Sequence, residues 1–481
     1  VFQIISQAMI FMVGFVSMVF CGHLGKTEFA GVSLAAAVVN VTGVSIGIGL
    51  SLTCDTLISQ TYGSGNLKRV GVILQRGVLI LLLACFPCWA VLINTEPLLL
   101  AVRQSPEVAS LAQLYVKIFM PALPATFIYQ LQGRYLQNQG IIWPQVITGA
   151  IGNLLNAVIN YIFLFPLDLG VAGSAAANAI SQYVLAVVLF VYIFWRGLHK
   201  ATWGGWSLDC LQEWGPFVKL AIPSMLMLCL EWWLFEVGGF LAGIISEAEL
   251  GAQSIIYQLT IIAFMFPLGI SAAASVRVGN ALGAGNVEQA KLSCKVSVIC
   301  AFIISCIVGT SFSLSRHVTG AILRGAGKPL VGALCNLVGY YFIGFPIGVS
   351  LMFAMKMGIV GLWIGLTICV LMQSIFFIAY LCRLDWRKTS EEALVRAGVK
   401  LKKEKKTVEM ENMGDNAPEN HPYVEVQIPD NPDHNVSTTT TVGVVLPVKQ
   451  LILRRGLALL LMVVILVVGI LLSDFLTHLL K

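Results

Sequence analysis

The sequence predicts an all-α membrane protein that crosses the bilayer many times and consists of two similar helical lobes. Of its 481 residues, 57% are apolar and 11% are charged, whereas soluble domains contain roughly 25% charged residues. Apolar stretches of about 20 residues, the length that a helix needs to cross a bilayer, follow one another along the chain. The net charge of +6 comes mostly from the connections between these stretches, a pattern that reports membrane topology and not a nucleic-acid partner.

Twelve apolar windows are expected to form the membrane-spanning helices. Eleven of them precede residue 385, and the twelfth follows a long polar segment. The windows are 1–20, 34–60, 71–93, 111–131, 145–165, 172–195, 217–245, 251–274, 292–314, 331–354, 359–381 and 452–472. Basic residues gather in the connections on one side of these helices, and the positive-inside rule places that side in the cytosol.

A repeated pattern of glycines predicts that the two halves of the chain have the same fold. In the first part of each copy, corresponding residues are separated by one constant offset, which pairs Gly63 with Gly283; we call this offset the first register. Further along the chain the offset is smaller and pairs Gly140 with Gly327, and we call it the second register. With six spans per copy, both copies insert in the same direction, which implies a pseudo-two-fold axis along the membrane normal and a cavity between the lobes.

The change of register means that the second copy is shorter than the first. The stretch from Gly63 to Gly140 corresponds to the much shorter stretch from Gly283 to Gly327. The shortfall falls near 315–321, opposite 94–132 in the first copy. The residues available there are too few and too polar for a span of about 20 residues. We therefore expect the second lobe to lack one helix near 315–321.

Changes in composition divide the chain into four expected parts. Residues 385–450 are first basic and then rich in Glu, Asn, Pro and Asp, which is typical of a solvated, disordered segment. The parts are an N-terminal lobe (1–200), a C-terminal lobe (201–384), a cytosolic disordered tail (385–450) and a C-terminal transmembrane helix (451–481). Because Val1 already lies inside an apolar run, we expect the N-terminus to be truncated.

Two carboxylates inside one apolar segment are the candidate functional residues. Glu231 and Glu236 lie within 217–245 and flank three aromatic residues. An acid inside a membrane span is costly and usually lines a cavity or an ion path, and aromatic faces attract organic cations. The alternative is a buried glutamate that bonds to a neighbouring helix. On an ideal helix these side chains point about 140° apart and cannot share one face. Because Trp232 adjoins Glu231, we expect Glu231 to face the cavity and Glu236 a neighbouring helix.

Four stretches resemble the multidrug and toxic compound extrusion (MATE) family, in its vertebrate branch. They are Cys21-Gly-His-Leu-Gly25, Cys54-Asp-Thr-Leu-Ile-Ser-Gln-Thr-Tyr-Gly63, Glu231-Trp-Trp233 and Ala274-Ser-Val-Arg-Val-Gly-Asn-Ala-Leu-Gly-Ala-Gly285. The resemblance implies a two-lobed bundle of twelve helices, followed in vertebrate members by an additional C-terminal helix. It also implies proton-coupled export of organic cations across the plasma membrane by alternating access.

The resemblance assigns roles to individual residues. It makes Glu231 and Glu236 the carboxylates that couple protons to cations. The residues that it places in or beside the substrate cavity are Gln7, Cys21, Asn40, Trp232 and Tyr257. Two positions depart from the family pattern, because Gln258 replaces a usual glutamate and Phe235 a usual tyrosine. A further carboxylate of the family belongs to the stretch that the second copy lacks.

We therefore expect a multi-pass secondary transporter of the plasma membrane that exports organic cations and drugs in exchange for protons. A carboxyl group in such a site can hold either a proton or a cation, and this competition constitutes an antiport cycle. The expected partners are small organic cations, drugs and the lipid bilayer, with protons as the coupling ion and neither a metal nor another cofactor. No motif indicates an enzyme. The alternatives are a transport-impaired splice form, a non-transporting membrane protein, a sodium-coupled exporter and a lipid flippase of the same superfamily.

Overall fold

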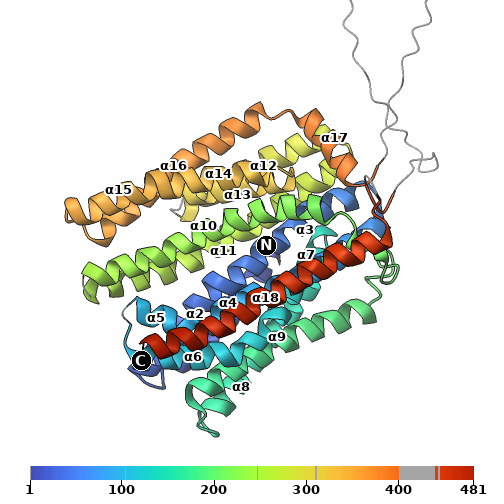
Figure 1. Ribbon diagram of the computed structural model, residues 1–481. Coiled ribbons are helices and arrows are strands. Elements are labelled where there is room, and N and C mark those ends of the chain that lie inside the picture. The colour runs from blue at the N-terminus through green and yellow to red at the C-terminus, as the bar shows by residue number, and fades with distance from the viewer. Residues whose placement is uncertain are drawn as a thin grey trace, which may run out of the picture.

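The computed structural model describes residues 2–102, 104–245, 247–308, 311–399, 439–442 and 445–480. Within this part of the chain the regular structure is helical (Figure 1). Ten helices in it are long and apolar enough to cross a membrane. The window expected at 251–274 falls in the helix α11 (Glu247–Gly283), and most of the window expected at 292–314 falls in the helix α12 (Val287–Val308). An all-α, multi-pass membrane fold is thus confirmed.

The described residues of the first half contain nine α-helices. They are α1 (Phe2–Cys21), α2 (Lys26–Val39), α3 (Ser45–Gly63), α4 (Leu67–Ile93), α5 (Thr95–Ala101), α6 (Pro106–Phe119), α7 (Leu123–Asn138), α8 (Trp143–Leu164) and α9 (Gly170–Trp195). The π-helical η1 (Asn40–Val44) joins α2 to α3, and the 3-10 turn η2 (Met120–Ala122) joins α6 to α7. As a result, 26–63 and 106–138 each form one continuous span.

The second half follows a similar order from α10 onward, with fewer elements. Its elements are η3 (Leu208–Leu211), α10 (Trp214–Ile245), α11 (Glu247–Gly283), α12 (Val287–Val308), α13 (Ser311–Gly325), α14 (Pro329–Asn336), η4 (Leu337–Gly344), α15 (Phe345–Val349), η5 (Ser350–Ala354) and α16 (Ile359–Arg383). Among the described residues after this half, α17 (Trp386–Arg396) and α18 (Val448–Leu480) are helices. The expectation of disorder from residue 385 is therefore wrong for 386–396, which form α17. Figure 1 shows α14, α15 and α16 on one side of the bundle, α8 and α9 on the other, and α10 and α11 between them.

Contacts between the halves are reciprocal, as a pseudo-two-fold axis requires. A Cβ atom added to Gly63 would overlap the carbonyl oxygen of Asn280, and one added to Gly283 would overlap that of Gln60. The first register of the repeat, which pairs Gly63 with Gly283, also pairs Gln60 with Asn280 and so converts one contact into the other. Glycine is needed at both positions because the two backbones touch there. The corresponding helix pairs α1 with α11 and α10 with α3 also pack together.

The shortening of the second half differs in detail from the expectation. The second register makes α13 the counterpart of α7, whereas α5 and α6 have no counterpart between α12 and α13. Residues 315–321, where we expected the missing helix, therefore lie within a helix. Its 15 residues extend over about 22 Å, less than the roughly 30 Å of a bilayer core. The second half therefore lacks a counterpart of α6, which forms the first part of the span that α7 completes, and of α5, which precedes that span.

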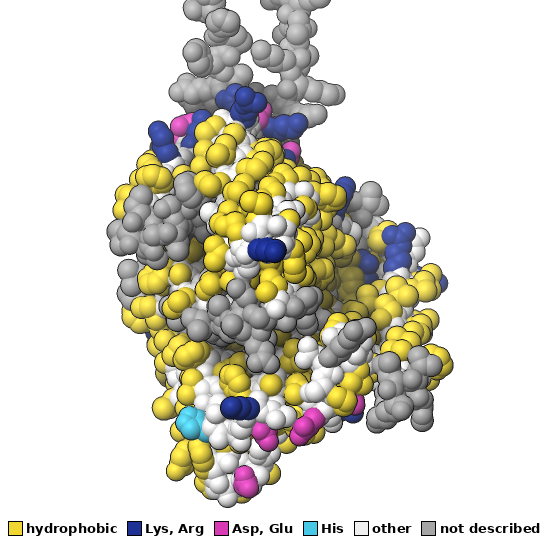
Figure 2. Space-filling view, turned by 90° about the vertical axis from the view of Figure 1, so that its left-hand side faces the viewer, with side chains coloured by type: hydrophobic (Ala, Val, Ile, Leu, Met, Phe, Trp, Pro, Cys, Tyr) yellow, Lys and Arg dark blue, Asp and Glu magenta, His cyan; other side chains and the backbone are white. Residues whose placement is uncertain are grey.

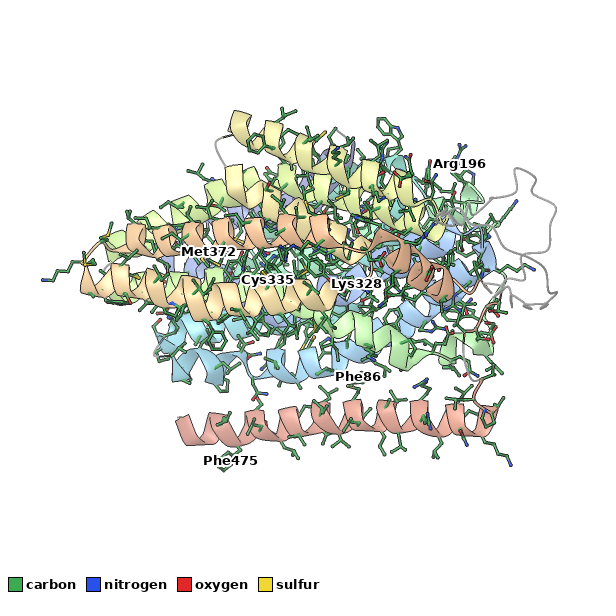
Figure 3. The ribbon with its side chains drawn as sticks, turned by 90° about the horizontal axis from the view of Figure 1, so that it is seen from above. Phe86, Arg196, Lys328, Cys335, Met372 and Phe475 are labelled. Atoms are coloured by element: carbon green, nitrogen blue, oxygen red, sulfur yellow. The ribbon has the colours of Figure 1, made fainter. Side chains whose placement is uncertain are left out.

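The helix α17 crosses the contact between the two halves at one end of the bundle. Glu392 binds Lys328 of the second half at 2.6 Å, and Arg396 Nη1 donates to Gln60 Oε1 of the first half at 3.0 Å. Lys328 lies beside α17 in Figure 3. Figure 2 shows a largely hydrophobic face of the molecule, with one group of Lys and Arg side chains at the top and others scattered below it. We call the end of the bundle at which α17 lies (Figure 1) the α17 end.

The last helix, α18, lies along the outside of the first half. A Cβ atom on Gly469 would lie 2.7 Å from the Cβ of Ala90 on α4, and Asn94 Nδ2 donates to the Gly469 carbonyl oxygen at 2.9 Å. Phe475 points away from the bundle (Figure 3) and is 63% exposed. The C-terminus lies at the opposite end of the bundle from α17 (Figure 1). The structure thus places the expected additional C-terminal helix against α4.

Candidate functional site

Glu231 lies inside the second half and forms a two-point ion pair with Arg316. Arg316 Nη1 is 2.6 Å from Glu231 Oε1, and Arg316 Nη2 is 3.1 Å from Glu231 Oε2. Glu231 on α10 is 4% exposed and Arg316 on α13 is 2% exposed. A planar guanidinium that meets both oxygens of a carboxylate is among the strongest forms of ion pair in proteins. Arg316 therefore neutralises Glu231.

Three further side chains surround this ion pair. His317 Nε2 lies 3.0 Å from Glu231 Oε1. Asn336 Oδ1 accepts a hydrogen bond from Arg316 Nη2 at 3.2 Å, and the ring of Tyr340 lies 4.9 Å from the guanidinium carbon. The guanidinium is thus held by a carboxylate, an amide oxygen and an aromatic face, which are groups that can recognise organic cations.

The two groups next to the cation are fixed by their own contacts. Asn336 Nδ2 donates to the carbonyl oxygen of Met227 on α10 at 2.7 Å, which orients its amide oxygen toward Arg316. The ring of Phe264 packs edge-on against His317, with ring centroids 4.3 Å apart. Residues from α10, α11, α13, α14 and η4 therefore build this site.

The charge pair has no equivalent in the first half. The first register of the repeat places Phe11 at the position of Glu231, and the second register places Tyr129 at that of Arg316. Tyr129 is buried in the core of the first half. The pair is therefore a feature of the second half and not part of the repeated scaffold.

The other predicted carboxylate lies further along α10. Glu236 is partly exposed, whereas Glu231 is buried. Between them, Trp233 reaches the first half, because its Nε1 donates to the carbonyl oxygen of Val41 in η1 at 3.0 Å. Trp232, the ring predicted to line the cavity, is half-buried. The indole that links the halves at this level is thus Trp233, which the resemblance did not assign to the cavity.

The remaining predicted cavity residues are dispersed. Gln7 is buried on α1, a helix that packs against α8 and α11. Cys21, at the end of α1, donates from Sγ to Ser174 Oγ at 2.9 Å inside the core of the first half. Asn40 is exposed at the first residue of η1. The side chain of Tyr257 lies outside the described residues, as does that of Gln258.

A second buried acid, Asp55, has a structural explanation. Its Oδ2 accepts from Arg134 Nη1 at 3.2 Å, and its Oδ1 accepts from Asn138 Nδ2 at 3.1 Å. Thr56, next to it in the sequence, donates to the carbonyl oxygen of Arg324 across the contact between the halves, at 2.6 Å. Asp55 therefore fixes α7 to α3.

Sequence reasoning missed Arg316, His317, Asn336 and Tyr340. The available signal was a pair of basic residues, Arg316 and His317, in a stretch that borders apolar windows. Ionisable residues inside a membrane protein usually pair with one another, so Arg316 was a candidate partner for Glu231. The stretch around Arg316 was interpreted as a short polar connection between helices, so the pairing of Arg316 with Glu231 was not predicted.

The sequence matches the family model MatE over residues 3–162 and 223–319. Multidrug and toxin extrusion protein 1 of Danio rerio is 62% identical, and the alignment covers 99% of this chain and 89% of that protein. Its human namesake is 50% identical, with 97% of this chain and 90% of that protein covered. The fold resembles the crystal structure of the eukaryotic MATE transporter AtDTX14, with a TM-score of 0.79, 26% identity, and coverage of 82% of this chain and 96% of that one.

The alignment with the Danio rerio protein is longer than this chain. It runs over 526 positions, whereas the chain has 481 residues. The relative therefore has residues without a counterpart here. This agrees with a second half that is shorter than the first.

Proposed function

This chain belongs to the MatE family, and from that membership we propose that it exports organic cations and drugs across the plasma membrane in exchange for protons. Its relatives are named for multidrug and toxin extrusion, and the chain is a multi-pass membrane protein of this transport family. To this membership the proposal adds three statements: the cargo is an organic cation, the coupling ion is a proton, and the membrane is the plasma membrane.

The observation that carries the proposal is the carboxylate of Glu231 inside one of two pseudo-symmetric lobes. A buried carboxylate needs a positive partner or a proton, because an isolated charge in a low-dielectric interior is costly. One bound cation therefore replaces one proton. If the proton binds from outside and the cation from the cytosol, the exchange exports the cation.

The reciprocal contacts at the α17 end support alternating access. Gly63 with Asn280 and Gly283 with Gln60 bring α3 and α11 together at that end. Gln60 Nε2 also donates to the carbonyl oxygen of Gly325 at 2.9 Å. Because the glycine contacts come as a symmetry-related pair, rocking one lobe against the other can break them together. We place the α17 end in the cytosol, so this arrangement is the one that is closed on the inside.

A second candidate is a transport-impaired form of the same transporter. The observation that favours it is the ion pair itself, because Arg316 already meets both oxygens of Glu231. The shorter α13 also leaves one span of the second half incomplete. This alternative makes the same assignment of Glu231 but predicts a low rate of exchange.

Uptake of radiolabelled tetraethylammonium into acid-loaded cells tests the proposal. An outward proton gradient should drive uptake, and raising the outside pH should increase it further. The variant Glu231→Gln, matched for surface expression by antibody staining, should lose the pH-dependent component. The exchange would be refuted by uptake that does not depend on the proton gradient. It would also be refuted if the Glu231→Gln variant took up tetraethylammonium with the same pH dependence as the unaltered chain. Dependence on sodium in place of protons would indicate the sodium-coupled alternative.

A further inference from the structure

We propose that the second lobe contains a binding site for a small planar cation of the guanidinium type, and that the Arg316 side chain fills this site. The chain thus supplies its own cation to the carboxylate on which cargo binding depends. The binding site follows from the geometry around Arg316. Its effect on transport rests on the proposed function.

The carboxylate of Glu231 provides the selective part of the site. Its two oxygens lie 2.6 and 3.1 Å from the two terminal nitrogens of Arg316. This paired arrangement matches the planar fork of a guanidinium or an amidinium, whereas an ammonium offers a point charge without the fork. The site should therefore prefer planar cations to spherical ones.

The remaining contacts belong to a cation site and not to a simple ion pair. Asn336 Oδ1 accepts from the same nitrogen that meets Glu231 Oε2, at 3.2 Å. The Tyr340 ring covers the guanidinium carbon at 4.9 Å, within the range of a cation–π contact. A small cation that lacks the arginine backbone would find the same three groups.

Arg316 Nε is buried and has no hydrogen-bond partner among the residues that the structure describes. An unpaired buried donor is costly, so this side chain meets the site through its two terminal nitrogens and leaves the third nitrogen unused. A free guanidinium ion has no chain attached and can turn within the same space. The arginine thus fills the site without satisfying every donor that it brings.

The position of Arg316 links the site to the shortened span. It lies in the second turn of α13, close to the junction with α12 where the second half has lost residues relative to the first. The equivalent position in the first half is the uncharged Tyr129. A tethered side chain acts at a high effective concentration, so a free organic cation must displace Arg316 to reach Glu231. Exchange through Glu231 should therefore be slow in this chain and faster without Arg316.

Chemical rescue tests the site directly on purified, detergent-solubilised protein. The variant Arg316→Ala should be less stable than the unaltered chain and should regain stability with guanidinium chloride at low millimolar concentration. A concentration near ten times the dissociation constant should raise Tm by roughly 2 °C or more. Urea, the neutral analogue with the same shape, should have no such effect, and neither should sodium chloride at the same ionic strength.

The double variant Glu231→Gln/Arg316→Ala is the matched control, because it keeps the cavity and removes the charge. Guanidinium should leave its Tm unchanged. Equal stabilisation of the single and double variants, or no stabilisation of the single variant, would overturn the proposed site. These results do not depend on transport, so they separate the binding site from the proposed function.

If Arg316→Ala does not fold, Arg316→Met provides a second test, since methionine retains most of the side-chain volume. At equal surface expression, it should take up tetraethylammonium several-fold faster than the unaltered chain in acid-loaded cells. Adding Glu231→Gln should abolish that gain. Equal uptake by Arg316→Met and the unaltered chain would contradict the competition between Arg316 and cargo.

Discussion

Ser59 lies against Gly279, and the two residues are counterparts in the two halves of the chain. A Cβ atom on Gly279 would overlap Ser59 Oγ. Since the first register of the repeat pairs these two positions, the pseudo-two-fold axis passes between them. The flanking contacts, Gly63 with Asn280 and Gly283 with Gln60, are exchanged by the same axis. The α17 end is therefore closed at the axis itself, where the two backbones touch.

Alanine at Gly63 or Gly283 should separate the halves at this end. Each added Cβ would meet a backbone carbonyl, which cannot move aside as a flexible side chain can. We expect either variant to increase several-fold the rate at which a maleimide labels Gln60→Cys, a position that is fully buried in the closed arrangement. Gly14→Ala is the control, because a Cβ at that position meets no atom within 4 Å. Labelling that remains at the control rate in both variants would argue against closure at the axis.

The ion pair between Glu231 and Arg316 should behave as one unit in stability measurements. Removing one member leaves a buried charge without its partner, which typically costs about 3 to 5 kcal/mol. Glu231→Gln and Arg316→Gln should each lower Tm markedly, whereas the double variant should recover most of the loss. A double variant whose loss equals the sum of the two single losses would show that the residues do not interact.

Trp233 should contribute to the contact between the halves through its indole N–H. Replacing Trp233 with Phe removes the hydrogen bond to the Val41 carbonyl oxygen, which should cost about 1 kcal/mol. A chemical denaturation series or a Tm measurement detects this loss. Trp232→Phe is the comparison, and we expect it to affect organic-cation uptake more than stability. The opposite ranking of the two variants would assign the cavity to Trp233.

The attachment of α17 should weaken in acid. Partial burial by itself raises the pKa of Glu392, but the hydrogen bond and charge of Lys328 together with the charge of Arg396 lower it overall. Because the folded-state pKa is depressed, the stabilisation is complete above the unfolded value of about 4.3 and is lost as the pH falls through the lower folded value.

A spin label on Val395→Cys, an exposed position of α17, monitors this attachment. Its mobility should rise between pH 7 and strongly acidic pH. The variant Glu392→Gln should be mobile already at pH 7, with a flatter pH dependence. A pH profile that is identical with and without Glu392 would show that another group holds α17.

The hydropathy and glycine patterns were enough to predict the architecture, for separate physical reasons. A bilayer requires long apolar helices, so the spans are readable from composition. The repeated glycines mark places where two backbones meet, so Gly63 and Gly283 identify the contact between the halves from the sequence alone. The same pattern revealed that the second half is shorter.

The partners of Glu231 could not be predicted in this way. Arg316 lies 85 residues further along the chain, and its position depends on how α13 packs after the shortened junction. The polar character of that stretch indicated a connection, whereas Arg316 and His317 are paired inside the lobe. Cys21, which the resemblance places in or beside the cavity, bonds to Ser174 in the core of the first half, and its role in the cavity stays a prediction. The role of Tyr257 stays a prediction.

The most direct measurement of the central claim uses purified protein in proteoliposomes, where only this chain can carry cargo. With an acidic lumen, radiolabelled tetraethylammonium should accumulate inside, and a proton ionophore that collapses the gradient should release it. Glu231→Gln should show no accumulation, and Arg316→Met should accumulate the cation faster than the unaltered chain. Accumulation that persists without Glu231, or that is insensitive to the ionophore, would contradict an exchange of protons and cations at this carboxylate.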